Sequence, residues 1–162
     1  MTVNRLPHSS ASSPPGIDYR WRDPITDEEV VDLVLSHGGD ASPGWWPRVR
    51  EHSLGWVGAR DRTGCPAGLL VGFVNVAWDG GDHAFLIDTK TRGSHQHQGI
   101  GRRLVQVATR HAAAAGCEWL FVDFAAELAP FYLDACGFSR TPAGLIHLRT
   151  ASTSPTTSED RA

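Results

Sequence analysis

The fold of this chain is decided around one short stretch, QHQGIGR at residues 96–102. The stretch follows a predicted strand, His83–Thr91, and opens a helical pattern at residues 99–115, where apolar residues recur on one side. A helix N-terminus exposes free backbone N–H groups and the positive end of the helix dipole. Glycines at positions 99 and 101 let the backbone come close to a bound ligand. The stretch therefore predicts an anion site suited to a pyrophosphate.

Two other kinds of phosphate-binding loop are excluded by inspection. The chain has no GxxxxGK followed by Ser or Thr, which argues against a nucleoside triphosphatase. It also has no GxGxxG with an acidic residue downstream, which argues against a dinucleotide-binding domain. Two glycines at a helix start also occur in a plain turn from a strand into a helix, so the surrounding sequence has to decide between the two interpretations.

The rest of the chain supplies the order of the elements. A capping box at residues 26–29, with Thr26 followed three residues later by Glu29, starts a helix that stops at residues 38–39. Residues 79–82 form a hairpin signal between two strands. This order predicts an α/β (α+β) fold with helices on both faces of a sheet. The other expected elements are strands at Ile17–Arg22, Leu54–Arg60, Leu69–Trp78, Trp119–Phe124 and Leu145–Leu148, and a helix at Pro130–Ala135.

The composition is that of one ordinary globular domain. Of the 162 residues, 41% are hydrophobic and 20% are charged, which is enough to bury a core. The formal net charge is −3, and no run of Lys and Arg is longer than two residues. A nucleic acid or an anionic membrane needs clustered positive charge, so we expect neither as a partner.

The cysteines and the chain ends indicate the compartment and the domain bounds. The three cysteines are odd in number and lack CxxC spacing, and no run approaches the roughly 18 apolar residues of a membrane span. The N-terminal segment has no apolar region typical of a signal peptide. We therefore expect a cytoplasmic protein with reduced thiols. Both ends are rich in Ser, Thr and Pro, which predicts disordered tails at 1–16 and 150–162 around a domain at 17–149.

Two motifs together resemble the GNAT N-acetyltransferase superfamily. The first is Q-x-x-G-x-G at residues 96–101, and the second is APFYLDACGF at residues 129–138, an aromatic-Tyr helix closed by Gly-Phe. Both occur in the family's order and at its separation, and the element order fits the family from Ile17 to Leu148. The resemblance implies a GNAT fold, with a central, twisted, mixed but mostly antiparallel sheet of six to seven strands and about four helices.

The resemblance also implies an activity and a co-substrate. It implies an acyltransferase that moves the acetyl group of acetyl-CoA to an amine of a small molecule or peptide, by direct transfer in a ternary complex. In the family the pantetheine arm runs beside the strand before the first motif, and the pyrophosphate lies at the turn. The implied cofactor-binding residues here are Thr89, Lys90 and Thr91 on the strand and Gln96, His97, Gln98, Gly99, Ile100, Gly101 and Arg102 at the turn.

The implied catalytic acid is Tyr132, which would protonate the departing thiolate. The second motif departs from the family pattern, because four residues rather than three separate Tyr132 from Gly137. Counting back from Gly137 puts Leu133 at the tyrosine position, whereas the aromatic pair puts Tyr132 there. A bulge in the helix would reconcile the two alignments.

The catalytic base is open among several residues. An ammonium group cannot attack a thioester, so the acceptor amine has to lose a proton. Asp88 is the first candidate, because it stands in an otherwise apolar strand, where a buried charge is costly without a task or a partner. His83, Asp123 and Glu127 are rivals, and a structural hydrogen-bonding role for Asp88 is the alternative. The glutamate that the family often carries on this strand is replaced by Phe85.

The acceptor is expected to be a small amine. In the GNAT fold the loop after the first helix overhangs the acceptor cleft, and Trp45 and Trp46 stand there with indole faces that attract cations. His95 and His97 lack a third ligand at a matching spacing, so we expect no metal. The alternative function is a non-catalytic acyl-CoA-binding regulatory module with the same fold. The sequence leaves open whether the chain is a monomer or a homodimer.

Overall fold

The computed structural model describes residues 14–148 of the chain and confirms the predicted α/β fold. Its regular elements follow the predicted order, except that residues 45–50 form a short helix and the last predicted strand is missing. Short 3-10 turns stand beside each of the two motifs. The elements are β1 (Ile17–Trp21), α1 (Asp27–Ser36), α2 (Trp45–Arg50), β2 (Ser53–Asp61), β3 (Leu69–Trp78), β4 (His83–Thr91), η1 (Gly93–His95), α3 (Ile100–Ala114), β5 (Trp119–Val122), η2 (Ala126–Leu128) and the π-helix η3 (Pro130–Ala135).

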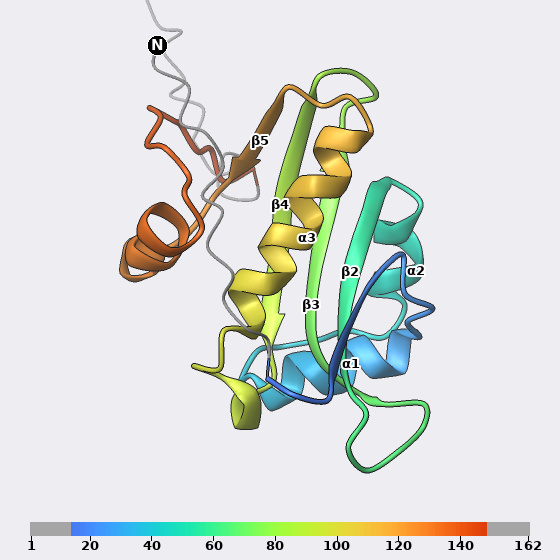
Figure 1. Cartoon of the computed structure of the whole chain (residues 1–162). Helices are drawn as coiled ribbons and strands as arrows, with labels where there is room; N and C mark the ends of the chain where they lie inside the picture. Colours follow the sequence, from blue (N-terminus) through green and yellow to red (C-terminus); the bar gives the residue numbers. More distant parts are fainter. Residues whose placement is uncertain (1–13, 149–162) are drawn as a thin grey trace, which may run out of the picture.

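The five strands form one sheet in the order β1-β2-β3-β4-β5. Neighbouring strands are antiparallel except β4 and β5, which pair in parallel. Helix α3 lies across one face of the sheet, and α1 and α2 lie against the other (Figure 1). One apolar core fills the space under α3, and a second fills the space under α1 and α2. The molecule therefore has three layers, and each face of the sheet has its own core.

Helix α3 packs closely on the sheet because its apolar residues fall on one side. Ile100, Leu104 and Ala108 are at most 1% exposed and contact the sheet. Gly72 on β3 makes the close approach possible, since a Cβ there would come within 2.9 Å of Leu104 Cδ1. At its end the helix stops before Gly116, which takes the left-handed conformation with φ 95°. The helix predicted from the sequence pattern is thus confirmed.

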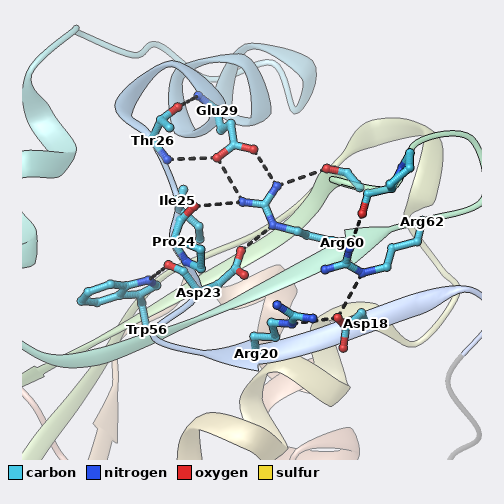
Figure 2. Close-up of polar contacts among 12 residues, drawn as sticks. Asp18, Arg20, Asp23, Pro24, Ile25, Thr26, Glu29, Trp56, Arg60 and Arg62 are labelled. Carbon is cyan, nitrogen blue, oxygen red and sulfur yellow. Dashed lines mark hydrogen bonds and ion pairs between the residues drawn. The ribbon is translucent and has the colours of Figure 1, made fainter.

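Helix α1 is fastened to the sheet by a buried arginine. We call Arg60 and its two carboxylate partners, Asp23 and Glu29, the Arg60 cluster (Figure 2). Arg60 Nε donates to Asp23 Oδ2 at 2.6 Å, and Nη1 donates to Glu29 Oε1 at 2.6 Å. The guanidinium also donates to the carbonyl oxygens of Gly68 at 3.1 Å and Pro24 at 3.3 Å. The side chains of Arg60 and Asp23 are only 7% and 1% exposed, so these bonds replace the water that both charges lose on folding.

The predicted capping box is present at the start of α1 and shares Glu29 with this cluster. Thr26 Oγ1 accepts from Glu29 N at 3.3 Å, and Glu29 Oε2 accepts from Thr26 N at 3.0 Å. Hydrogen bonding from Arg60 lowers the pKa of Glu29, although burial acts in the opposite direction. A single carboxylate therefore caps the helix and neutralises a buried cation.

The strand predicted at residues 145–148 is not formed. Residues 139–148 have no strand or helix, and Leu145, Ile146 and Leu148 are 87%, 77% and 78% exposed. An apolar run indicates that a segment can form a strand. It does so only beside a free strand edge and where neighbouring residues can bury its side chains. The described residues accordingly hold five strands instead of six or seven. The predicted tails at 1–16 and 150–162 lie almost wholly outside the described residues.

Candidate functional site

The second half of β4 is irregular at Asp88. Between the pairs on either side, β3 has one residue, at position 74, where β4 has two, Asp88 and Thr89. Asp88 takes φ 56°, in the left-handed region that non-glycine residues rarely adopt. A bulge of this kind bends the strand. Since β5 pairs with β4 only from His83 to Leu86, we call the edge at residues 87–91 the β4 opening (Figure 1).

The turn that follows β4 is fixed at its base and exposed at its tip. His95 Nε2 lies 3.2 Å from Asp61 Oδ2, and Gln96 Nε2 lies 3.0 Å from His37 Nδ1. The next three residues, 97–99, are exposed. The base of the turn is therefore tied to β2 and to the end of α1, while its tip is available to a ligand.

The tip has the geometry of an anion site. His97 and Gly99 take positive φ values of 60° and 80°, and a Cβ added to Gly99 would meet no atom of residues 14–148 within 4 Å. The Ile100 side chain is 1% exposed in the core, so only its backbone N–H can face a ligand. Arg102 Nε is buried and has no hydrogen-bond partner among residues 14–148. The turn thus presents the free N–H groups of a helix start at an exposed tip, an arrangement that suits an anion.

The other residues expected to contact the co-substrate lie beside this tip. A Cβ on Gly101 would come 3.3 Å from the Phe131 ring and 3.5 Å from Thr91 Oγ1, so the second glycine of the motif allows α3, η3 and β4 to meet. Gln98 is exposed, and its Nε2 donates to the Ser94 carbonyl oxygen at 3.5 Å. The structure therefore brings the two sequence motifs together at the end of β4.

The extra residue of the second motif is absorbed by the π-helix η3. Cys136 N donates to Phe131 O at 3.0 Å, which spans five residues instead of the four of an α-helix. Tyr132 is 6% exposed and packs against the rings of Phe124 and Phe131, with centroids 4.9 and 4.8 Å away. The tyrosine, and not the leucine that follows it, is the buried residue of this helix. The bulge that would reconcile the two alignments is present.

Burial raises the pKa of the Tyr132 hydroxyl, and the polar side chain of Thr89 nearby offsets part of that shift. The phenol therefore keeps its proton at neutral pH and can donate it. Burial also raises the pKa of the nearby Cys136 thiol to about 11. Cys136 is thus a neutral thiol and not a nucleophilic thiolate.

Asp88 opens onto a hollow of about 290 Å³ on the face of the sheet that carries α1 and α2, which we call the first hollow. Its walls come from α1, the loop after it, Trp45 of α2, and Asp88 and Lys90 of β4. Trp46 does not reach it, because Trp46 is 1% exposed in the core under α1 and α2. Of the tryptophan pair expected to overhang an acceptor, only Trp45 lines the first hollow.

The structure corrects the expectation that Asp88 is a buried charge. Its side chain is 30% exposed, and its Oδ1 lies 3.6 Å from Lys90 Nζ. The bulge takes the residue out of the regular strand alternation, so the carboxylate faces the first hollow instead of an apolar core. A ligand in the hollow can therefore reach this carboxylate.

The rival carboxylates and histidine lie elsewhere. His83 is at the start of β4, roughly 16 Å from Asp88 at about 3.3 Å per residue, and its Nδ1 lies 3.2 Å from Asp79 Oδ2. Asp123 and Glu127 are exposed beyond β5, and neither they nor His83 line the first hollow. Within residues 14–148, no group of three or more His, Cys, Asp or Glu side chains is placed to hold a metal ion.

Residues 19–138 match the acetyltransferase (GNAT) family. The matched range covers nearly three quarters of the chain and includes the sheet, the turn before α3 and the π-helix. The chain therefore belongs to the GNAT acetyltransferase family. Among curated proteins, none matches this sequence.

Several solved structures share the fold. A GNAT family acetyltransferase from Streptococcus pneumoniae is 22% identical, with a TM-score of 0.64 over 81% of this chain and 98% of that chain. A GNAT family N-acetyltransferase from Escherichia coli, in complex with CoA, is 18% identical, with a TM-score of 0.61 over 86% and 72%. An aminoglycoside N-acetyltransferase in complex with CoA is 18% identical, with a TM-score of 0.63 over 81% and 93%. None of the helices in residues 14–148 is long and apolar enough to cross a membrane.

Proposed function

We propose that this chain is an N-acetyltransferase that moves the acetyl group of acetyl-CoA directly to an amine of a small molecule or peptide. The observation that carries the proposal is the β4 opening. There Asp88 faces the first hollow on one face of the sheet, whereas Tyr132 belongs to the core on the other face. The exposed turn at residues 97–99 follows at the end of the same strand.

The residues of the turn and of the opening fit the co-substrate. Acetyl-CoA supplies an activated thioester and carries a pyrophosphate. Backbone N–H groups at residues 97–102 are the donors that would hold the pyrophosphate, with Arg102 in the first turn of the helix. The edge of β4 at residues 87–91 faces no strand on the β5 side among the described residues, so its backbone can pair with an extended ligand such as the pantetheine arm.

The two side chains at the opening are suited to opposite proton transfers. Asp88 is accessible from the first hollow and would take the proton of the acceptor amine. Tyr132 is protonated at neutral pH and would give its proton to the departing thiolate. Because the two lie on opposite faces of one strand, the attacking and leaving groups are served from opposite sides. A backbone N–H at the bulge would stabilise the oxyanion between them.

Direct transfer is favoured over transfer through the enzyme. A covalent acyl-enzyme needs an activated nucleophile, and Cys136, the thiol next to Tyr132, has its pKa raised to about 11 by burial. The donor and the acceptor would therefore occupy the protein together, in one ternary complex.

The test of the proposal uses one pair of glycine variants. Gly99→Val places a side chain in the open space before the turn. Gly80→Val imposes the same backbone strain at the far hairpin, where φ is 87° and no atom of the described residues would lie within 4 Å of the added Cβ. By calorimetry, acetyl-CoA should bind to the wild type and to Gly80→Val, and binding to Gly99→Val should fall at least about tenfold. Equal affinities would overturn the assignment of the turn.

Turnover separates the enzyme from the alternative of a non-catalytic acyl-CoA-binding module. The full chain, acetyl-CoA and a panel of primary amines are incubated, and the free thiol of CoA is measured. Amine-dependent thiol release supports the acetyltransferase. Tight binding of acetyl-CoA without release for any amine supports the non-catalytic module.

A further inference from the structure

A second hollow, of about 260 Å³, lies on the same face of the sheet as the first. Arg48 and Val49 of α2 and His52 of the turn after it form one wall, and Ala77 of β3 and Ile87 of β4 form the other, with Asn75 between them. The two hollows are neighbours, because α2 and β4 contribute to both and Ile87 directly precedes Asp88 in the chain. A molecule with its amine at Asp88 can therefore extend into the second hollow.

The floor of the second hollow carries an unsatisfied amide. Asn75 is 0% exposed, and neither its Oδ1 nor its Nδ2 has a hydrogen-bond partner among residues 14–148. A buried donor or acceptor that makes no hydrogen bond costs about 1–3 kcal/mol of stability. An apolar side chain of similar shape would avoid this desolvation penalty. An orphaned amide in this place therefore calls for a function.

The chemistry of the second hollow defines the group that it fits. Asn75 offers one donor group and one acceptor, and an amide of the ligand satisfies both at once. The walls at Val49, Ala77 and Ile87 are apolar, and within the described range 14–148 no acidic residue lines this hollow. Arg48 and His52 are exposed at its rim, where the charge of Arg48 disfavours a second ammonium group. The hollow thus suits a neutral amide flanked by an apolar substituent.

We propose that Asn75 selects acceptors in which the reactive amine stands next to an amide, as in an amino-acid amide or the first residue of a peptide. This inference rests on the proposed acetyltransferase function. Asn75 is the register partner of Ile87, and Asp88 is the next residue, so the amine and the amide of the acceptor are only a few bonds apart. Asn75 binds the amide, and the apolar side chain of the acceptor packs against Val49 and Ile87.

Binding is tested first, because it needs no turnover. The chain contains only two asparagines, Asn4 and Asn75, so isotope labelling of asparagine side-chain nitrogens gives two sets of amide signals in a nuclear magnetic resonance spectrum. The signals that disappear in Asn75→Leu belong to Asn75. Leucinamide should shift these signals, and 3-methylbutylamine, which lacks only the carboxamide, should not. Unmoved signals, or equal shifts with both amines, would overturn the proposal.

Kinetics then test selection. The two amines differ in basicity, so the measured quantity is the ratio of their kcat/KM values in wild type against that ratio in Asn75→Leu. The variant should reduce the preference for leucinamide by about tenfold or more, with unchanged acetyl-CoA affinity and no fall in Tm. A fall in Tm with an unchanged preference would show a structural role and overturn the proposal. Absence of acetyl-CoA binding would instead overturn the proposed function, and the binding experiment would still decide the role of Asn75.

Discussion

The Arg60 cluster and the β4 opening differ in how fully their polar groups are hydrogen-bonded within the protein. Arg60 is a buried cation that donates to two carboxylates and two backbone carbonyl oxygens. Around the β4 opening, Asn75 of β3 is buried without a hydrogen-bond partner among residues 14–148, Asp88 holds a strained backbone conformation, and Tyr132 lies in a π-helix. A polar group that is fully bonded inside the protein stabilises the fold. A group left unbonded or strained costs stability, so the comparison separates residues that hold the fold from candidates for contact with ligands.

The largest effect is expected at the opening. Tyr132→Phe should lower kcat by about 10²- to 10⁴-fold, because a general acid is lost, and should leave KM for acetyl-CoA nearly unchanged, because the ring still packs. Stopped-time assays of thiol release at saturating amine measure this effect. An unchanged kcat would remove Tyr132 from the mechanism and leave the turn at residues 97–99 unaffected.

At the Arg60 cluster we expect a loss of stability with kcat unchanged. Arg60→Met should lower the free energy of unfolding by about 3–5 kcal/mol, because Asp23 would keep a buried charge without a counterion. Urea unfolding measures the loss, and kcat of the folded fraction should stay at the wild-type value. Combining the variant with Asp23→Leu should recover part of the stability. A loss below about 1 kcal/mol would mean that the cluster does not hold α1.

The smallest expected effect is a change, at acidic pH, in how the free energy of unfolding depends on pH. The pKa of Glu29 is lowered in the folded protein, chiefly by hydrogen bonding from Arg60. Its contribution to stability is therefore complete above the ordinary value of 4.5 and is lost as the pH falls through the lower folded pKa. Thermal unfolding of Glu29→Gln should show a flatter dependence on pH in this acid range than the wild type. Parallel curves for the two proteins would refute the linkage.

Local patterns made much of this structure predictable. The capping box at Thr26, the periodicity of α3 and the strand-turn-helix context of residues 96–102 each depend on neighbours in the chain, and each is present. The Arg60 cluster was not predicted, because it joins residues 37 positions apart, and sequence spacing does not show which distant side chains meet. The prediction of a strand at 145–148 was wrong for the same reason, because the sequence does not show which distant segment could pair with it.

At the candidate site, the exposure of Asp88 was not predicted because it depends on an irregularity of the backbone. The bulge exposes Asp88, and the argument from a costly buried charge failed because it assumed a regular strand. Asn75 was missed altogether. One signal could have found it, since its carboxamide interrupts an otherwise apolar run, LLVGFVNVAW at residues 69–78. A lone amide in a central strand predicts either a buried hydrogen bond or a ligand, and only the surrounding contacts decide between them.

The π-helix has a consequence for how the spacing of the second motif is interpreted. A π turn is an α-helix that has taken in one more residue, with the backbone on both sides kept in place. Phe131 O still receives the N–H of Cys136, and Tyr132 O still receives that of Phe138, so the insertion is contained between them. The extra residue therefore changes the hydrogen bonding of this one helical turn and does not lengthen the segments beside it. An insertion of this kind changes the count between two motif residues and leaves their positions in space alone.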